Sequence, residues 1–199
     1  MTDHVITRLS GALAVAAGLT VALAAYLQSL EPVGCIGDGC DGHAMRDTPT
    51  SVTLLLGVGG VLLVASVLGL GLILHRRDRL GRLGVVACGL LVAGAAVLAA
   101  GGAFAVLFPE PSEDAMPGFV IPGIGAIAIG LFLLAVAVFR AHILPTWSVA
   151  LVAVGVVVMV FVNEQTSRVL LAIPFCLAWA LAGLLLLRAT PDDAPIASS

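Results

Sequence analysis

Long apolar runs separated by short polar segments make up most of the chain. Six runs come close to the roughly 20 residues that an α-helix needs to cross the hydrocarbon core of a bilayer. None has an Asp, Glu, Lys or Arg at its middle, and none alternates like the strands of a membrane barrel. The pattern predicts an all-α integral membrane protein with six transmembrane helices in an antiparallel up-down bundle, spanning 9–30, 51–74, 83–107, 118–139, 144–163 and 168–187.

Composition points to lipid as the solvent. Hydrophobic residues make up 60% of the 199 residues and charged residues 11%, whereas soluble domains carry about 25% charged residues. No basic stripe alternates with aromatic residues, so we expect no nucleic-acid partner. All nine basic residues are arginine, which we interpret as a genomic composition bias. We expect a multi-pass protein of a bacterial plasma membrane.

The first apolar run has some features of a signal peptide, with Arg8 before it and "ALAAY" (Ala22–Tyr26) near its end. The run over 9–30 is longer than the apolar region of such a peptide. We therefore expect it to remain in the protein as the first helix.

Arginine placement predicts the orientation, because cytoplasmic loops are enriched in Lys and Arg. Arg46 and Arg168 fall on one side of the predicted membrane. Seven fall on the side of the N-terminus, namely Arg8, Arg76, Arg77, Arg79, Arg82, Arg140 and Arg188. Both termini are therefore predicted to be cytoplasmic, with 31–50 an extracytoplasmic loop and 189–199 a flexible cytoplasmic tail.

The loop 31–50 contains "GCIGDGCDGHAM", the most polar stretch between the runs. An extracytoplasmic position favours oxidation of Cys35 and Cys40 to a disulfide. Two glycines between them permit the tight turn. Closing so short a loop would stabilise the protein by roughly 2 kcal/mol.

Two other interpretations of this loop remain open. A redox-active pair is less favoured, because the spacing is C-x4-C and no second cysteine pair is present to relay electrons. A metal site for Cu(I) or Zn has only weak candidate ligands, in one unrepeated cluster. These are Cys35, Cys40, His43 and Met45.

Other chemistry finds little support. The four histidines lie outside the helix interiors that would hold a membrane haem. No ionisable residue lies at mid-depth, as a proton-driven pump would need. We expect no cofactor and lean against an enzyme, although a lipid-modifying activity using His43 with Asp38 or Asp41 stays open.

Prolines mark two irregular places. Pro122 is predicted to lie at the start of the fourth helix, where proline is tolerated. Pro174 should kink the last helix or mark its first turns. With Cys176 and Trp179 it could line a pocket, but we favour a packing irregularity filled by a cysteine and an aromatic ring.

The segment "HRRDRLGR" is predicted to anchor the topology, and its arginines could also contact anionic lipid head groups at about 1 kcal/mol each. These are Arg76, Arg77, Arg79 and Arg82.

Glycine strips are the modest positive signal for a partner. Small residues let helix backbones approach closely in lipid, where no hydrophobic drive brings helices together. The strips predict either a tight bundle or a partner-binding face, and they do not separate the two. They comprise Gly11, Gly18, "GVGG" (57–60), Gly69, Gly71, Gly89 and Gly94.

The function expected from the sequence is an accessory or scaffold subunit of a membrane complex. Membrane lipids, other subunits or a second copy of the chain are the expected partners. The leading alternative is a carrier or binder of a small apolar solute or lipid. A cavity lined by Trp179 and Tyr26 would favour this alternative. The second alternative is an extracytoplasmic metal- or thiol-handling protein that uses the Cys35–Met45 loop.

Overall fold

The computed structural model describes residues 3–34, 46–108 and 112–188, and these ranges are helical apart from short connections. Apolar sequence forms helices here because lipid offers no partner for a free backbone N–H or C=O. The elements are α1 (Asp3–Ser29), α2 (Thr50–Arg76), α3 (Gly81–Leu107), α4 (Ser112–Ala141), α5 (Thr146–Met159), the 3-10 turn η1 (Ser167–Leu171) and α6 (Ala172–Arg188).

Five helical segments are long and apolar enough to cross a membrane, by length and composition: α1, α2, α3, α4 and the continuous stretch Ser167–Arg188. The protein is therefore membrane-embedded, as predicted. The span predicted over 144–163 differs, because α5 has 14 residues and ends at Met159. That length covers about 21 Å. Beyond it the backbone tightens into three-residue turns, such as Val160 N–H to Val157 O at 3.2 Å.

The start of α4 corrects a second prediction. Pro122 lies inside the helix rather than at its start, as does Pro117, because α4 begins at Ser112. Each proline lacks the N–H that would reach the carbonyl four residues earlier. Both lie in the first three turns of α4.

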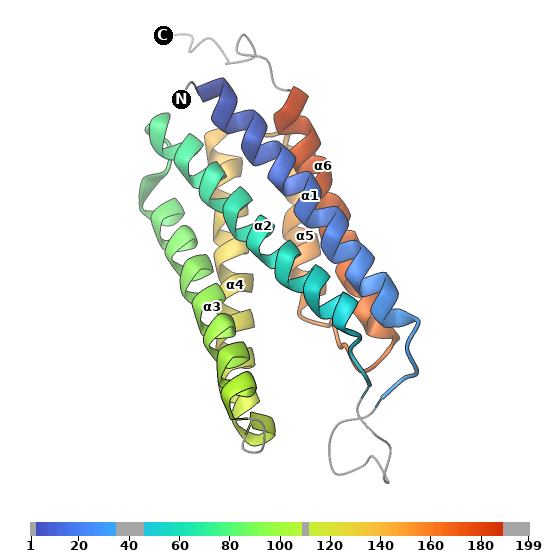
Figure 1. Cartoon of the computed structure of the whole chain (residues 1–199). Helices are drawn as coiled ribbons and strands as arrows, with labels where there is room; N and C mark the ends of the chain where they lie inside the picture. The colour runs from blue at the N-terminus through green and yellow to red at the C-terminus, as the bar shows by residue number, and fades with distance from the viewer. Residues whose placement is uncertain (1–2, 35–45, 109–111, 189–199) are drawn as a thin grey trace, which may run out of the picture.

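The helices form two closely packed groups (Figure 1). In one, α1 lies against both α2 and α6; in the other, α3 lies along α4. α5 packs against α6 and α4 and links the groups. α2 and α3 are joined by the short turn 77–80, yet they diverge away from it (Figure 1). The start of α1 and the end of α6 lie at the same end of the molecule.

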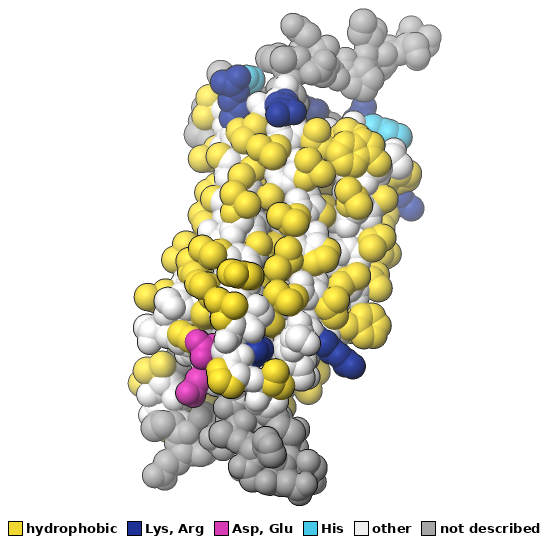
Figure 2. All heavy atoms as spheres, turned by 90° about the vertical axis from the view of Figure 1, so that its right-hand side faces the viewer, with side chains coloured by type: hydrophobic (Ala, Val, Ile, Leu, Met, Phe, Trp, Pro, Cys, Tyr) yellow, Lys and Arg dark blue, Asp and Glu magenta, His cyan; other side chains and the backbone are white. Residues whose placement is uncertain are grey.

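The outer surface agrees with a lipid environment. On the face seen in Figure 2, hydrophobic side chains cover the middle of the molecule, and the coloured charged side chains gather toward its two ends. Tyr26 near the end of α1 and Trp147 near the start of α5 are 53% and 51% exposed. Aromatic residues at span ends are typical of membrane–water interfaces.

Candidate functional site

The residues that the sequence favoured for chemistry in loop 31–50 lie outside the described part of the chain: Cys35, Cys40, His43 and Met45, with Asp38 and Asp41. The disulfide and the metal site remain predictions, and the tail 189–199 likewise lies outside the described residues. Over the described ranges, Cys88 and Cys176 are free thiols, and no three His, Cys, Asp or Glu side chains group as a metal site.

A buried arginine holds the base of this loop. Arg46 is 6% exposed, and its guanidinium donates only to backbone carbonyls. Nη1 donates to two carbonyls of the segment before η1, and Nε and Nη2 donate to three carbonyls at the end of α1. The acceptors are Glu164 O (3.0 Å), Thr166 O (3.1 Å), Glu31 O (3.2 Å from Nε and 2.5 Å from Nη2), Pro32 O (3.1 Å) and Ser29 O (3.3 Å).

Gln165 completes what we call the Arg46 clamp. Its side-chain Oε1 accepts from Arg46 N–H at 2.6 Å, and its backbone oxygen accepts from Gly34 N–H at 3.0 Å. Both ends of the 35–45 segment are thus tied to the chain before η1. Since every N–H group of the guanidinium is directed at a carbonyl, Arg46 has no donor left for an anionic ligand.

Next to the clamp, Gln28 is 3% exposed and its Nε2 donates to Asp47 O at 3.1 Å. Its Oε1 accepts no hydrogen bond from the described residues. This amide oxygen is buried and uncharged, and it identifies no particular ligand.

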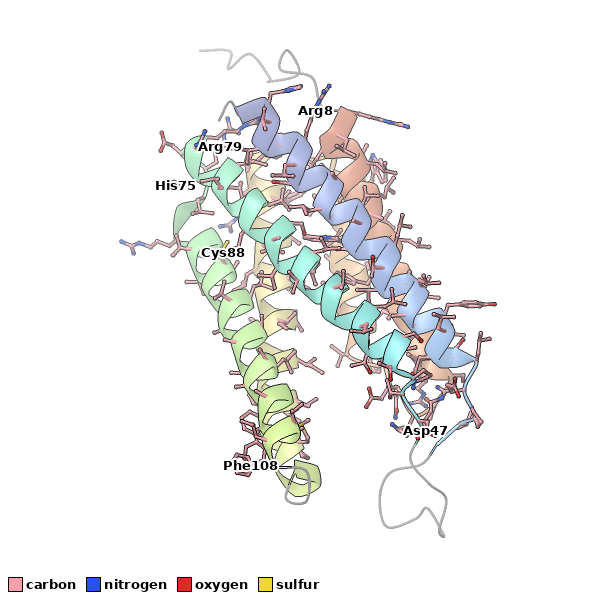
Figure 3. All side chains as sticks on the ribbon, viewed as in Figure 1. Arg8, Asp47, His75, Arg79, Cys88 and Phe108 are labelled. Carbon is pink, nitrogen blue, oxygen red and sulfur yellow. The ribbon has the colours of Figure 1, made fainter. Side chains whose placement is uncertain are left out.

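At the opposite end, arginines surround the α2–α3 turn. Arg8, His75 and Arg79 lie there, far from Asp47 (Figure 3). Arg79 Nη1 donates to Ala141 O at 2.9 Å, where a cation compensates the negative end of the α4 dipole. Arg77 and Arg82 are exposed and make no hydrogen bond or ion pair with described residues.

The pocket considered near Pro174 is largely closed. Cys176 and Trp179 are 1% and 4% exposed, and the Trp179 indole N–H donates to Ser66 Oγ at 3.2 Å. The cavity beside Trp179 measures about 20 Å³, enough for about one water. Pro174 is exposed in the first turn of α6, and Tyr26 is exposed at the far end of α1. The structure does not bring Trp179 and Tyr26 together around a cavity.

The large opening lies elsewhere, between α2 and α3. We call it the α2–α3 groove; it measures about 800 Å³ and its walls are almost wholly apolar. Residues on its walls include Gly57, Gly60 and Val64 of α2, Ala95 and Ala99 of α3, and Ile127 of α4. Sequence reasoning noted the glycines but not the groove.

The glycines divide into two classes. A Cβ placed on Gly11 would lie 2.7 Å from Gly183 O, and one on Gly94 would lie 2.7 Å from Gly123 O. These glycines serve packing within the protein. A Cβ on Gly57 or Gly60 would meet nothing within 4 Å, so these two face open space on the groove wall.

The groove passes through the middle of its helices. Its wall on α2 runs from Leu56 to Leu68, about 18 Å, and its wall on α3 runs from Leu91 to Ala99. Both stretches include the midpoint of their helix. The groove is therefore continuous across the depth at which the two lipid leaflets would meet.

No protein-family model matches the chain, and comparison with curated proteins and with solved structures found no match.

Proposed function

We propose that the protein is a non-enzymatic accessory subunit of a membrane complex, and that its α2–α3 groove receives an apolar transmembrane helix of a partner. The observation that carries the proposal is the groove of about 800 Å³ whose α2 wall presents Gly57 and Gly60 to open space. Helix association in lipid depends on close van der Waals contact, which small residues permit.

A helix suits the groove better than a lipid chain does, because the groove crosses the middle of α2 and α3. A phospholipid occupies one leaflet, whereas a transmembrane helix passes through both. The groove also has alanines at Ala95, Ala96 and Ala99 facing α2. A flexible acyl chain has no need of small residues on both walls.

In this proposal the chain crosses the plasma membrane as an up-down bundle with both termini in the cytoplasm. Support comes from seven exposed arginines at the end where α1 begins and α6 ends: Arg8, Arg76, Arg77, Arg79, Arg82, Arg140 and Arg188. At the other end, Arg46 is buried and donates its hydrogen bonds to backbone carbonyls. Among the described arginines at that end, Arg168 is the exposed one.

The second candidate is a carrier or binder of an apolar solute or lipid. The same groove favours it, since the groove is lined by apolar side chains and is open rather than enclosed. The two candidates differ in the occupant, so the occupant has to be identified in the native membrane.

Site-specific photocrosslinking does this. A photoreactive residue replaces Val61, which is 71% exposed on the groove wall, or Val106, which is 82% exposed on α3 away from it. We expect a protein adduct of one defined mass from position 61 and not from position 106. The mass also tells a distinct partner from a second copy of the chain.

Two glycine variants test whether the adduct depends on the groove. Gly60→Leu fills the groove wall and should abolish the protein adduct. Gly89→Leu is the matched control, because Gly89 also has open space around its Cβ position and lies outside the groove. Lipid adducts alone at position 61 would overturn the subunit proposal in favour of the carrier.

A further inference from the structure

The end of α4 gathers two arginines and exposed aromatic rings that the proposed function does not use. Independently of what occupies the groove, we propose that this cluster, the α4-end site, binds the head group of an anionic phospholipid. Its guanidinium groups come from two elements, Arg140 from the last turn of α4 and Arg79 from the turn between α2 and α3. The sequence grouped Arg79 with the arginines of its own turn, whereas the structure directs it to the end of α4.

The backbone brings the two arginines to one place. Arg79 Nη1 donates to Ala141 O at 2.9 Å, and Ala141 directly follows Arg140 at the end of α4. Asp78, with a φ of 51°, turns the chain immediately before Arg79, and His142, with a φ of 52°, turns it immediately after α4. The Ala141 carbonyl thus holds the Arg79 guanidinium beside the helix end that carries Arg140.

Most of the donors at this place are unused. A guanidinium has five N–H groups, and within the described part of the chain Arg79 directs one of them at Ala141 O. Arg140 is exposed, and its guanidinium makes no hydrogen bond or ion pair with a described residue. Asp78 is the neighbouring acid, and it makes no ion pair with the described residues either. Forked donors of this kind suit a phosphate group, which accepts two parallel N–H bonds.

Exposed aromatic rings place the site at the level of the lipid head groups. Phe139 precedes Arg140 and is 45% exposed, and Trp147 in the first turn of α5 is 51% exposed. The rings of Phe139 and His142 lie 6.2 Å apart. Exposed aromatic residues near the ends of membrane spans are typical of the boundary between acyl chains and head groups. The site therefore combines apolar rings with guanidinium groups at one depth.

This combination favours a lipid over a soluble acidic protein. A protein partner in water would meet the arginines without needing exposed apolar rings beside them. An anionic phospholipid uses both, because its phosphate meets the guanidinium groups while its acyl chains lie along the apolar surface below them. A single basic residue near the membrane surface attracts an anionic lipid only weakly, so the selectivity depends on Arg79 and Arg140 acting together.

The test follows the fluorescence of Trp147 in the full-length chain. Trp147 and Trp179 are the two tryptophans, so Trp179→Phe leaves Trp147 as the sole reporter. The protein is placed in phosphatidylcholine vesicles that contain brominated phosphatidylglycerol or brominated phosphatidylcholine, since bromine on an acyl chain quenches a nearby tryptophan. We expect half-quenching at an about three- to ten-fold lower mole fraction of phosphatidylglycerol. The chain with both tryptophans should rank the two lipids in the same order.

Arg79→Gln with Arg140→Gln should remove the preference for phosphatidylglycerol and leave quenching by phosphatidylcholine unchanged. Arg79→Lys with Arg140→Lys keeps both charges and should retain part of the preference, because lysine lacks the forked donors. Arg8→Gln is the matched control, since Arg8 is exposed at the same end but lies on α1, which packs against α2 and α6. It should leave the preference nearly intact.

Equal quenching by the two brominated lipids overturns the α4-end site, as does a preference that the paired glutamine change leaves intact. A preference that Arg8→Gln lowers as much as the pair does reveals a diffuse charge effect and also overturns the site. Loss of the preference on adding soluble glycerol phosphate, at matched ionic strength, overturns the lipid in favour of a free phosphate. Equal quenching together with binding of a fluorescent glutamate-rich peptide overturns it in favour of an acidic protein. The groove is tested separately by crosslinking at Val61.

Discussion

The α1–α6 contact and the α2–α3 pair use similar residues to opposite effect. Gly11 of α1 and Gly183 of α6 lie so close that a Cβ on either would approach the carbonyl oxygen of the other, at 2.7 and 2.6 Å. α2 and α3 are neighbours in sequence, yet Gly57 and Gly60 face the groove. Small residues permit close packing but do not enforce it, and the difference distinguishes a closed helix contact from an open groove.

The largest loss of stability should come from breaking the Arg46 clamp, which lies in the same group of helices as the α1–α6 contact. Arg46→Met removes the guanidinium donor from five backbone carbonyls, three near the end of α1 and two before η1. We expect a loss of about 3–5 kcal/mol, because several hydrogen bonds from a charged donor, each contributing about 1.5–3 kcal/mol, are removed together. Unfolding in mixed detergent–SDS micelles measures the free energy.

Arg46→Lys is the informative companion. Lysine keeps the charge but has three donors that cannot reach the same spread of carbonyls, so it should recover only part of the loss. Full recovery by lysine would show that charge alone, and not the fork of donors, holds the two segments together.

The next largest effect tests the α1–α6 contact directly. Gly18→Leu places a side chain against the Cys176 carbonyl oxygen and Ala180, where backbone cannot move aside. Overpacking of this kind should cost about 2–3 kcal/mol. The same unfolding assay, read by tryptophan fluorescence, measures the loss; an unchanged stability would mean that α1 and α6 are not packed as described.

A smaller effect concerns the polar contact inside the core. Ser66→Ala leaves the Trp179 indole N–H without its acceptor at 3.2 Å. We expect a loss of about 1 kcal/mol, since hydrogen bonds between membrane helices contribute modestly. A double-mutant cycle with Trp179→Phe isolates the coupling, and additivity of the two single changes would argue against the hydrogen bond.

The smallest effect on stability is expected from a substitution in the α2–α3 groove. Gly57→Leu changes nothing within 4 Å of the new Cβ and exchanges glycine for a better helix former. The free energy of unfolding of the isolated protein should stay within about 0.5 kcal/mol of the original or rise slightly. A large loss would mean that the groove closes in the isolated protein, and the contrast between the two helix pairs would disappear.

The sequence predicted the membrane helices well, because long uncharged runs have few alternatives in lipid. It placed Pro122 wrongly, since the polar start of α4 gave no signal of helix before residue 118. The extent of α5 was also misjudged, because Val160–Val162 are apolar whether or not they continue a helix.

The candidate site was much less predictable. Gly11, Gly57 and Gly60 look alike as small residues in apolar runs, and only the packing decides that Gly11 meets α6 while the other two meet open space. Arg46 likewise looked like an ordinary loop charge. Its role depends on carbonyls 118 and 120 residues away, a separation across which a hydropathy pattern carries no information.

That separation also has a consequence for the order in which the protein is made. A chain enters the membrane N-terminus first, at about 5–20 residues per second, so the acceptors at Glu164 and Thr166 follow Arg46 by about 6–24 s. During this interval α2 through α5 are synthesised, and the Arg46 guanidinium lacks two of its acceptors. The clamp therefore closes late in synthesis, after α5 has been made, and it fixes the segment before η1 and α6 against the end of α1.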